Sequence, residues 1–163
     1  MGYTHYYSVR DRGSTEWQQA WPALIADALT VVEATRGYVD LSGPAEDLED
    51  YSQPPSINVR TGIHLNGVGS NSHEDFILQK NGQWRFCKTR RKSYDVVVTC
   101  ILLRAFMLAP GQFHVSSDGS WAEWMEARDL YDELWPDEDV RCPWGEGEEE
   151  SDSEETGSIN GGS

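Results

Sequence analysis

The hydrophobic pattern of this chain changes its period several times, and each change predicts an element. Residues 3–9, with the sequence YTHYYSV, are aromatic and β-branched and predict a strand with His5 and Tyr7 on one face. Four further segments have strand character: residues 57–67, 73–80, 83–89 and 112–117. Asn81-Gly82 is a dipeptide typical of tight hairpin turns, so we expect the strands on either side of it to pair.

Apolar side chains at helical spacing predict a first helix, with a stripe formed by Trp17, Trp21, Leu24, Ile25, Ala28 and Val32. Thr15 and Gln18 fit a capping box at its start, with Thr15 as the N-cap. Pro22 predicts a kink or a later start, and Gly37 predicts the end of the helix.

Two more helices follow. Residues 93–108 are apolar on nearly all sides, which favours a buried helix over a strand. Ser120 and Glu123 form a second capping box, and the apolar stripe after it predicts a helix that ends at Pro136.

The predicted order is βαβββαβα. Helices that gather on one face of a mostly antiparallel sheet give an α+β two-layer sandwich, here with about five strands and three helices. We assign this single domain to residues 1–136. Glu, Ser, Asp and Gly dominate residues 137–163, which predicts a disordered acidic tail.

Charge and cysteine content narrow the function classes. The net charge is −15, and residues 136–163 hold ten acidic residues against one arginine. The negative electrostatic potential of such a chain argues against non-specific nucleic-acid binding. Three widely spaced cysteines and no signal-peptide pattern predict a soluble cytoplasmic protein with free thiols. The apolar run from Val96 to Leu108 is too short to span a bilayer, so no membrane partner is predicted.

Five of the 13 basic residues fall within eight positions near the start of the predicted helix 93–108: Arg85, Lys88, Arg90, Arg91 and Lys92. Cations there face the positive end of the helix dipole, and a bound phosphate or carboxylate would resolve that conflict. The alternative is a solvated turn whose charges offset the acidic body. Cys87 lies among these cations, which would lower the pKa of its thiol, although a cysteine on a strand is more often buried.

A second candidate is the segment 62–76, which is rich in Gly and Asn and contains His64 and His73. Glycine-rich loops let a ligand approach the backbone, but this spacing matches no nucleotide-binding motif, and the alternative is a long polar hairpin loop. His73 beside Glu74 could supply acid–base chemistry. No histidine spacing in the chain indicates a metal site, so neither a metal nor a cofactor is predicted.

A third candidate is residues 114–121, HVSSDGSW, where a strand end runs into a capped helix. The alternative is ordinary helix-entry chemistry.

Several of these segments together, MGYTHYY, GIHLNG, HEDF, FCKTRRKSYD and SSDGSW, resemble a group of small bacterial and phage proteins. That group begins MGYTHYW and carries F-N-G, H-E-T-F, F-C-K-T-x-x-K-x-Y-D and S-S-D-G-x-W segments. The resemblance spans most of residues 1–135 and brings no catalytic residue with it. The chain departs from the pattern at Tyr7, Leu65 and Asp75, where the group has Trp, Phe and Thr.

The matched positions are mostly polar, so we expect them to line one pocket. We predict a phage-type cytoplasmic protein that binds a small phosphorylated ligand, such as a nucleotide or cyclic nucleotide, and that sequesters or hydrolyses a host defence signal. Tyr3, Tyr7 or Tyr94 would stack on a base. His73 and Glu74 are the predicted catalytic residues. The predicted ligand-binding residues are His5, Tyr7, Asn66, Lys88, Arg91, Lys92, Tyr94, Ser117 and Asp118.

Two alternatives stay open. The acidic loop 46–50 and the tail could bind a basic protein partner, as a DNA mimic does. A virion or scaffold component is the third possibility.

Overall fold

The computed structural model describes residues 3–47 and 49–145. In this part of the chain, six strands and three α-helices build two antiparallel sheets with helices on one side, which confirms the predicted α+β class. Residues 146–163, most of the predicted acidic tail, lie outside the described residues.

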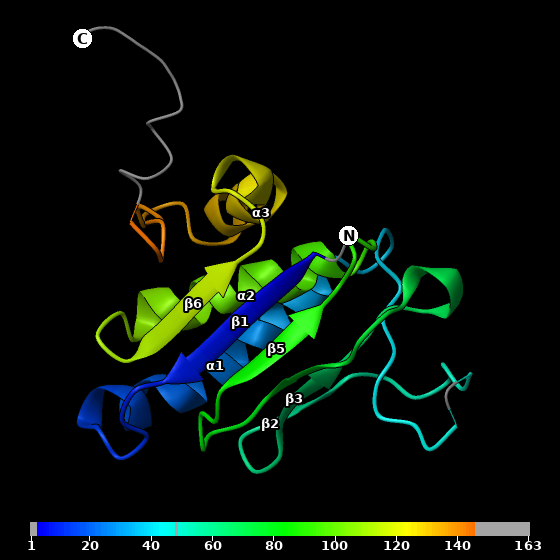
Figure 1. Ribbon diagram of the computed structural model, residues 1–163, viewed down its shortest axis with the longest axis horizontal. Coiled ribbons are helices and arrows are strands. Elements are labelled where there is room, and N and C mark those ends of the chain that lie inside the picture. Colours follow the sequence, from blue (N-terminus) through cyan, green and yellow to red (C-terminus); the bar gives the residue numbers. More distant parts are fainter. Residues whose placement is uncertain (1–2, 48, 146–163) are drawn as a thin grey trace, which may run out of the picture.

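The first sheet has a strand from the start of the chain at its centre. β1 (Thr4–Val9) pairs with β5 (Arg85–Lys88) on one side and with β6 (Phe113–Ser117) on the other, antiparallel in both cases. Successive side chains of a strand point to opposite faces. His5 therefore points to the face that the helices cover, the inner face, and Tyr6 points to the opposite, outer face (Figure 1).

The second sheet is formed by β2 (Ser56–Asn58), β3 (Gly62–Leu65) and β4 (Phe76–Leu78). The single strand predicted over 57–67 is wrong, because the chain reverses direction between β2 and β3. The Asn58 carboxamide oxygen accepts two backbone N–H groups of this turn, and Gly62 has a φ of 90°. The strand predicted over 57–67 therefore included the residues of this turn.

The hairpin predicted at Asn81-Gly82 is also wrong. The strands before and after it, β4 and β5, belong to different sheets. Gly82 has a φ of 64° and accepts the backbone N–H of Val9 at 2.9 Å. The turn therefore forms, but β1 takes the place beside β5 that a local hairpin partner would occupy.

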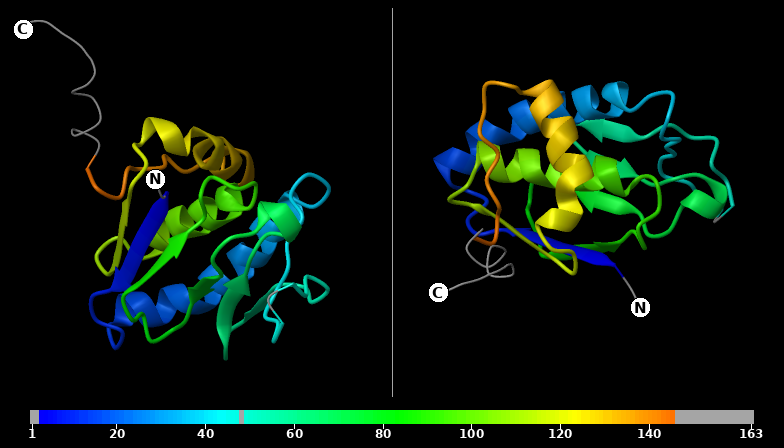
Figure 2. Two further views of the ribbon diagram at one scale, coloured as in Figure 1. Left: turned by 45° about the vertical axis from the view of Figure 1, so that its right-hand side comes forward. Right: turned by 90° about the horizontal axis from the view of Figure 1, so that it is seen from above.

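Two helices cover the inner face (Figures 1 and 2): α1 (Thr15–Ala34) and α2 (Asp95–Leu108). The N-cap of α1 is Ser14 rather than Thr15, since its hydroxyl accepts the N–H of Trp17 at 3.1 Å. The helix runs through Pro22 without ending.

The prediction that the apolar segment before Pro110 is a buried helix is confirmed, because α2 is buried from Val96 to Phe106. It lies between α1 and the short helix α3 (Met125–Leu134). Before α3, Ser120 and Glu123 exchange two hydrogen bonds of 2.9 and 3.3 Å, which confirms the second capping box.

One buried cation ties the helices together. The Arg104 guanidinium in α2 donates to Asp27 in α1 at 2.7 Å, to the Tyr131 hydroxyl in α3 at 2.7 Å and to Glu138 at 2.9 Å. Burial opposes the charge of Arg104, but these hydrogen bonds outweigh it and raise the pKa of the guanidinium. Residues after α3 also pack on the body, since Trp144 meets Trp124 edge-on at 5.2 Å. The packed chain therefore continues past Pro136.

Among the described residues, no helix has both the length and the apolar character that crossing a bilayer requires.

Candidate functional site

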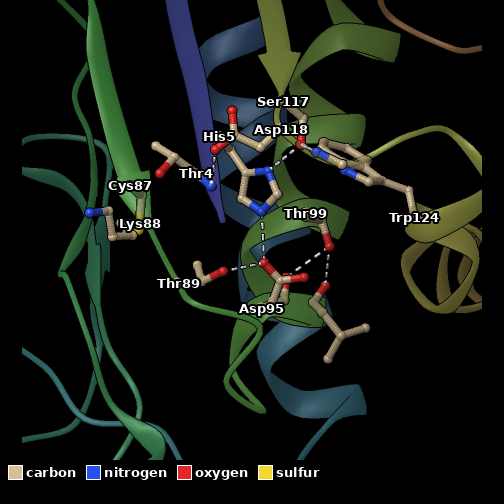
Figure 3. Close-up of polar contacts among 12 residues, drawn as sticks. Thr4, His5, Cys87, Lys88, Thr89, Asp95, Thr99, Ser117, Asp118 and Trp124 are labelled. Carbon is tan, nitrogen blue, oxygen red and sulfur yellow. Dashed lines mark hydrogen bonds and ion pairs between the residues drawn. The ribbon is translucent and has the colours of Figure 1, made fainter. Parts of the chain in front are cut away.

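His5 lies at the centre of a buried hydrogen-bond chain on the inner face (Figure 3). Its Nε2 lies 2.7 Å from a carboxylate oxygen of Asp95, and its Nδ1 lies 2.8 Å from the Ser117 hydroxyl. Tyr3 and Trp124 meet the imidazole edge-on, at centroid distances of 5.1 and 5.2 Å. The ring is fully buried, so His5 is a core histidine with a partner for each nitrogen.

The partners of Ser117 fix the tautomer of His5. The Ser117 oxygen accepts two N–H groups, from the backbone of Gly119 at 2.9 Å and from the indole of Trp124 at 3.2 Å. Its two lone pairs are then used, so the hydroxyl proton points at His5 Nδ1. His5 Nδ1 therefore accepts the Ser117 hydroxyl proton, and the Nε2–H group donates to Asp95.

Ser117, His5 and Asp95 follow the order of the catalytic triad of serine hydrolases, in which histidine takes the serine proton and the acid orients the ring. The surroundings of Ser117 oppose that role. A nucleophile needs a free lone pair and access to substrate, whereas both lone pairs of Ser117 accept hydrogen bonds and His5 has no exposed surface. The chain of hydrogen bonds joins β1, β6 and α2 instead.

Asp95 is the member of this chain that the sequence did not single out. The same oxygen that contacts His5 also accepts the Thr89 hydroxyl at 2.6 Å, and Thr99 donates to the Asp95 backbone carbonyl at 2.8 Å. An acidic residue in the first turn of a helix interacts favourably with the helix dipole. The position of Asp95 at the start of the apolar segment was thus a usable signal.

The predicted catalytic pair, His73 and Glu74, joins the two sheets. His73 Nδ1 lies 2.8 Å from the Lys88 carbonyl, and Glu74 Oε1 accepts the Lys88 N–H at 2.8 Å. Both side chains therefore satisfy the backbone of one residue of β5. Among the described residues no hydrogen bond joins His73 to Glu74, so the structure does not bring them together as an acid–base pair.

Asn66, a predicted ligand residue, uses all of its hydrogen-bonding capacity within the protein. Its Nδ2 donates to the His73 carbonyl and to Asp75, at 3.0 and 2.7 Å. Its Oδ1 accepts the N–H groups of Gly67 and His73, at 2.6 and 3.1 Å. The side chain holds the loop closed, and no donor or acceptor is left for a ligand.

The tyrosines expected to stack on a base, Tyr3, Tyr7 and Tyr94, are all buried on the inner side. The Tyr7 hydroxyl donates to the Ile77 carbonyl and that of Tyr94 to the Glu74 carbonyl. Burial raises the pKa of both phenols. These three rings belong to the hydrophobic core, so none is available to stack on a base.

Cys87 corrects another expectation. Burial raises the pKa of this thiol, and the neighbouring cations do not lower it. Strand alternation turns Lys88 to the outer face, whereas Cys87 lies opposite His5 and shares the inner face with Arg85, and burial is the largest cause of the raised pKa.

The outer face of the first sheet carries the rings that the sequence reading missed. Tyr6 and Phe86 lie directly opposite each other on β1 and β5, and Trp84 precedes β5. Their ring centroids form a triangle with sides of 5.6, 6.3 and 6.5 Å, and the planes of Tyr6 and Trp84 are 22° apart. Trp84 is 61% exposed and Phe86 48%. The helices α1 and α2 cover the opposite face of this sheet (Figure 2).

Two predicted ligand residues share this outer face. Lys88 follows Phe86 by two positions on β5 and pairs with Thr4. Asp118 lies on the other side of Thr4, whose N–H donates to the Asp118 carboxylate at 3.1 Å. The Tyr6 hydroxyl lies 3.5 Å from the other carboxylate oxygen. A cation and an anion thus lie on the two sides of β1, next to the aromatic triangle.

The remaining predicted cations lie in the loop between β5 and α2. Arg90 and Arg91 both have left-handed backbone conformations, with φ of 52° and 60°, which cost non-glycine residues about 1–2 kcal/mol each. The Arg91 guanidinium lies 3.9 Å from the Tyr3 ring centroid and 3.0 Å from Glu123. Among the described residues, Lys88, Arg90 and Lys92 have no carboxylate within ion-pair distance, so their charge is available to an anion.

The predicted residues therefore divide into three sets. His5, Tyr7, Tyr94 and Ser117 belong to the core, and Asn66, His73 and Glu74 hold the junction between the sheets. The third set is charged: Lys88 and Asp118 lie on the outer face, and Arg91 and Lys92 lie in the loop after β5, where Arg91 contacts the Tyr3 ring of the inner side. Within the described residues, no group of three or more His, Cys, Asp or Glu side chains is arranged to hold a metal ion.

Comparison of the chain with protein-family models, with curated proteins and with solved structures finds no match.

Proposed function

We propose that this protein binds a nucleotide on the outer face of the β5-β1-β6 sheet. The observation that carries the proposal is the triangle of Tyr6, Trp84 and Phe86 beside Lys88, in which the rings of Trp84 and Phe86 are exposed. Solvent-exposed rings next to unpaired cations match the two parts of a nucleotide, a flat base and a phosphate.

The spacing on β5 suits one ligand that reaches both groups. Phe86 and Lys88 point to the same face, and their Cα atoms lie about 6.6 Å apart along the strand, at a rise of about 3.3 Å per residue. A base that stacks on Phe86 or Trp84 then places its phosphate toward Lys88 and the loop of Arg90–Lys92. Stacking on an aromatic side chain contributes about 1–3 kcal/mol per base, enough for measurable binding of a small ligand.

The proposed activity is binding rather than hydrolysis. His73 and Glu74 have hydrogen bonds to the Lys88 backbone, and Ser117 has no free lone pair. The side chains best suited to acid–base or nucleophilic work are thus engaged in holding the fold. A protein of this kind sequesters its ligand.

Titration calorimetry with adenosine and guanosine monophosphates tests the proposal on matched variants. Trp84→Ala should weaken binding at least about fivefold, whereas Tyr38→Ala, which removes another ring that is 61% exposed, should not. Lys88→Gln should weaken binding of the monophosphate but not of the nucleoside, and Lys80→Gln, in the exposed turn before β5, should affect neither.

Two results would contradict the proposal. One is no heat with any nucleotide up to millimolar concentration. The other is binding that Trp84→Ala and Lys88→Gln leave intact, because the ligand would then occupy a different surface.

A further inference from the structure

We infer that the preferred ligand carries two bases, as a 5′-phosphorylated dinucleotide does, and that a single mononucleotide fills only part of the surface. This inference rests on the proposed function and specifies the size of the ligand. It rests on the order of side chains on the outer face, where the rings of Trp84 and Phe86 come before the cation of Lys88.

The order follows from strand geometry. Trp84, Phe86 and Lys88 are spaced by two residues, so their side chains follow one another on the outer face at intervals of about 6.6 Å. Two aromatic positions thus precede the first cation. The ligand that matches this order has two stacking groups followed by a terminal phosphate.

The rings themselves offer more than one stacking surface. Tyr6 and Trp84 have nearly parallel planes, 6.3 Å apart between centroids, whereas Phe86 is tilted by 50° to Tyr6 and by 57° to Trp84. A single flat base cannot lie against two rings that are tilted by 50° or more. Two bases linked by a flexible phosphodiester can each adopt the plane of their own ring.

The surroundings limit the ligand to about this length. Asp118 lies within 3.5 Å of the Tyr6 hydroxyl and would repel a phosphate on that side. Among the described residues the other exposed tyrosine, tryptophan or phenylalanine ring, Tyr38, follows α1, and the exposed imidazole of His114 lies on β6, with β1 between it and the rings of Trp84 and Phe86. The chain as a whole has a net charge of −15, which weakens binding of a long polyanion.

The test is a length series of 5′-phosphorylated oligoadenylates, from one to eight nucleotides, measured by calorimetry with the full chain. We expect affinity to rise at least about fivefold from one nucleotide to two, and to change by less than about twofold beyond two. Trp84→Ala and Phe86→Ala should each bring the dinucleotide down to the affinity of the mononucleotide, while Tyr38→Ala should retain the full difference.

Other outcomes are equally informative. Equal affinities for one and two nucleotides, both lost in Lys88→Gln, would overturn this inference and leave the proposed function standing. Affinity that keeps rising to eight nucleotides would overturn it in favour of a single-strand binder. If the protein bound tetramethylammonium and bound no nucleotide, both proposals would be overturned, since three rings can also enclose a quaternary ammonium ion.

Discussion

His5 and Tyr6 are neighbours on β1, yet the two faces they occupy differ in how their polar groups are used. On the inner face, both nitrogens of His5 and all the hydrogen-bonding capacity of Ser117 have protein partners. On the outer face, the rings around Tyr6 are open to solvent and Lys88 has no carboxylate partner among the described residues. A group that is fully hydrogen-bonded inside the protein stabilises the fold, whereas an exposed group with free capacity is available to a ligand.

The largest loss of stability is expected when the His5 side chain is removed from the inner face. In His5→Ala, the Asp95 carboxylate and the Ser117 hydroxyl each lose a buried partner, which costs about 1–3 kcal/mol per group. We expect the free energy of unfolding, measured by urea denaturation, to fall by about 3 kcal/mol. His114→Ala, on the exposed side of β6, is the matched control and should change it by less than about 0.5 kcal/mol. A small effect at His5 would show that the buried chain is not structural.

Ser117→Ala should have the next largest effect. It leaves His5, Gly119 and Trp124 without the oxygen they share, and we expect a loss of about 2 kcal/mol in unfolding free energy. Nucleotide affinity, measured on the folded variant, should stay within about twofold of the wild type because Ser117 faces away from the proposed site. Loss of binding with unchanged stability would assign Ser117 to the ligand.

The pH dependence of stability reports on Tyr3, which packs against His5 on the inner face. Burial, followed by the negative charge of Asp95, raises the pKa of Tyr3 from 10.0 to about 12. The folded state therefore holds the phenol proton more tightly, so this stabilisation is complete below pH 10 and is lost as the pH rises to 12. The melting temperature of the wild type should fall more steeply over this range than that of Tyr3→Phe. Parallel curves for the two proteins would contradict this pKa.

The smallest effect on stability is expected on the outer face. Trp84→Ser removes a largely exposed ring and should change the unfolding free energy by less than about 0.5 kcal/mol, measured by the same urea denaturation. Its nucleotide affinity should nevertheless fall, as in Trp84→Ala, because the ring that would stack on the base is gone. A strongly destabilised Trp84→Ser would mean that the outer face also belongs to the core.

The fold class and most elements could be predicted from the sequence because they depend on local patterns. The apolar segment of α2, the capping box at Ser120 and the alternation of β1 all carry their structure within a few residues. Strand pairing was not local. Asn81-Gly82 does form a turn, but nothing within the segment shows that β1, more than 70 positions earlier, lies beside β5.

The candidate site was harder to predict for a related reason. The sequence selected residue types with chemical potential, such as His5, Ser117 and Asn66, and these turned out to have protein partners for their polar atoms. Chemical type does not reveal whether a polar group is already satisfied. The strand alternation that puts His5 inside also puts Tyr6 outside, so the exposed rings could have been sought at alternate positions of the same segments.

The chain passes from one sheet to the other between β4 and β5, yet the two sheets share one hydrophobic core. The sheet of β2–β4 meets β5 around Lys88, through His73 and Glu74, and it meets β1 through Tyr7, whose ring packs on Phe76 at 5.4 Å and whose hydroxyl donates to the Ile77 carbonyl. Insertions in the turn between β2 and β3 would leave the pairing of β5, β1 and β6 untouched. Substitutions at the core positions of β4, by contrast, would reach the inner face of the first sheet through Tyr7, which packs against Phe76.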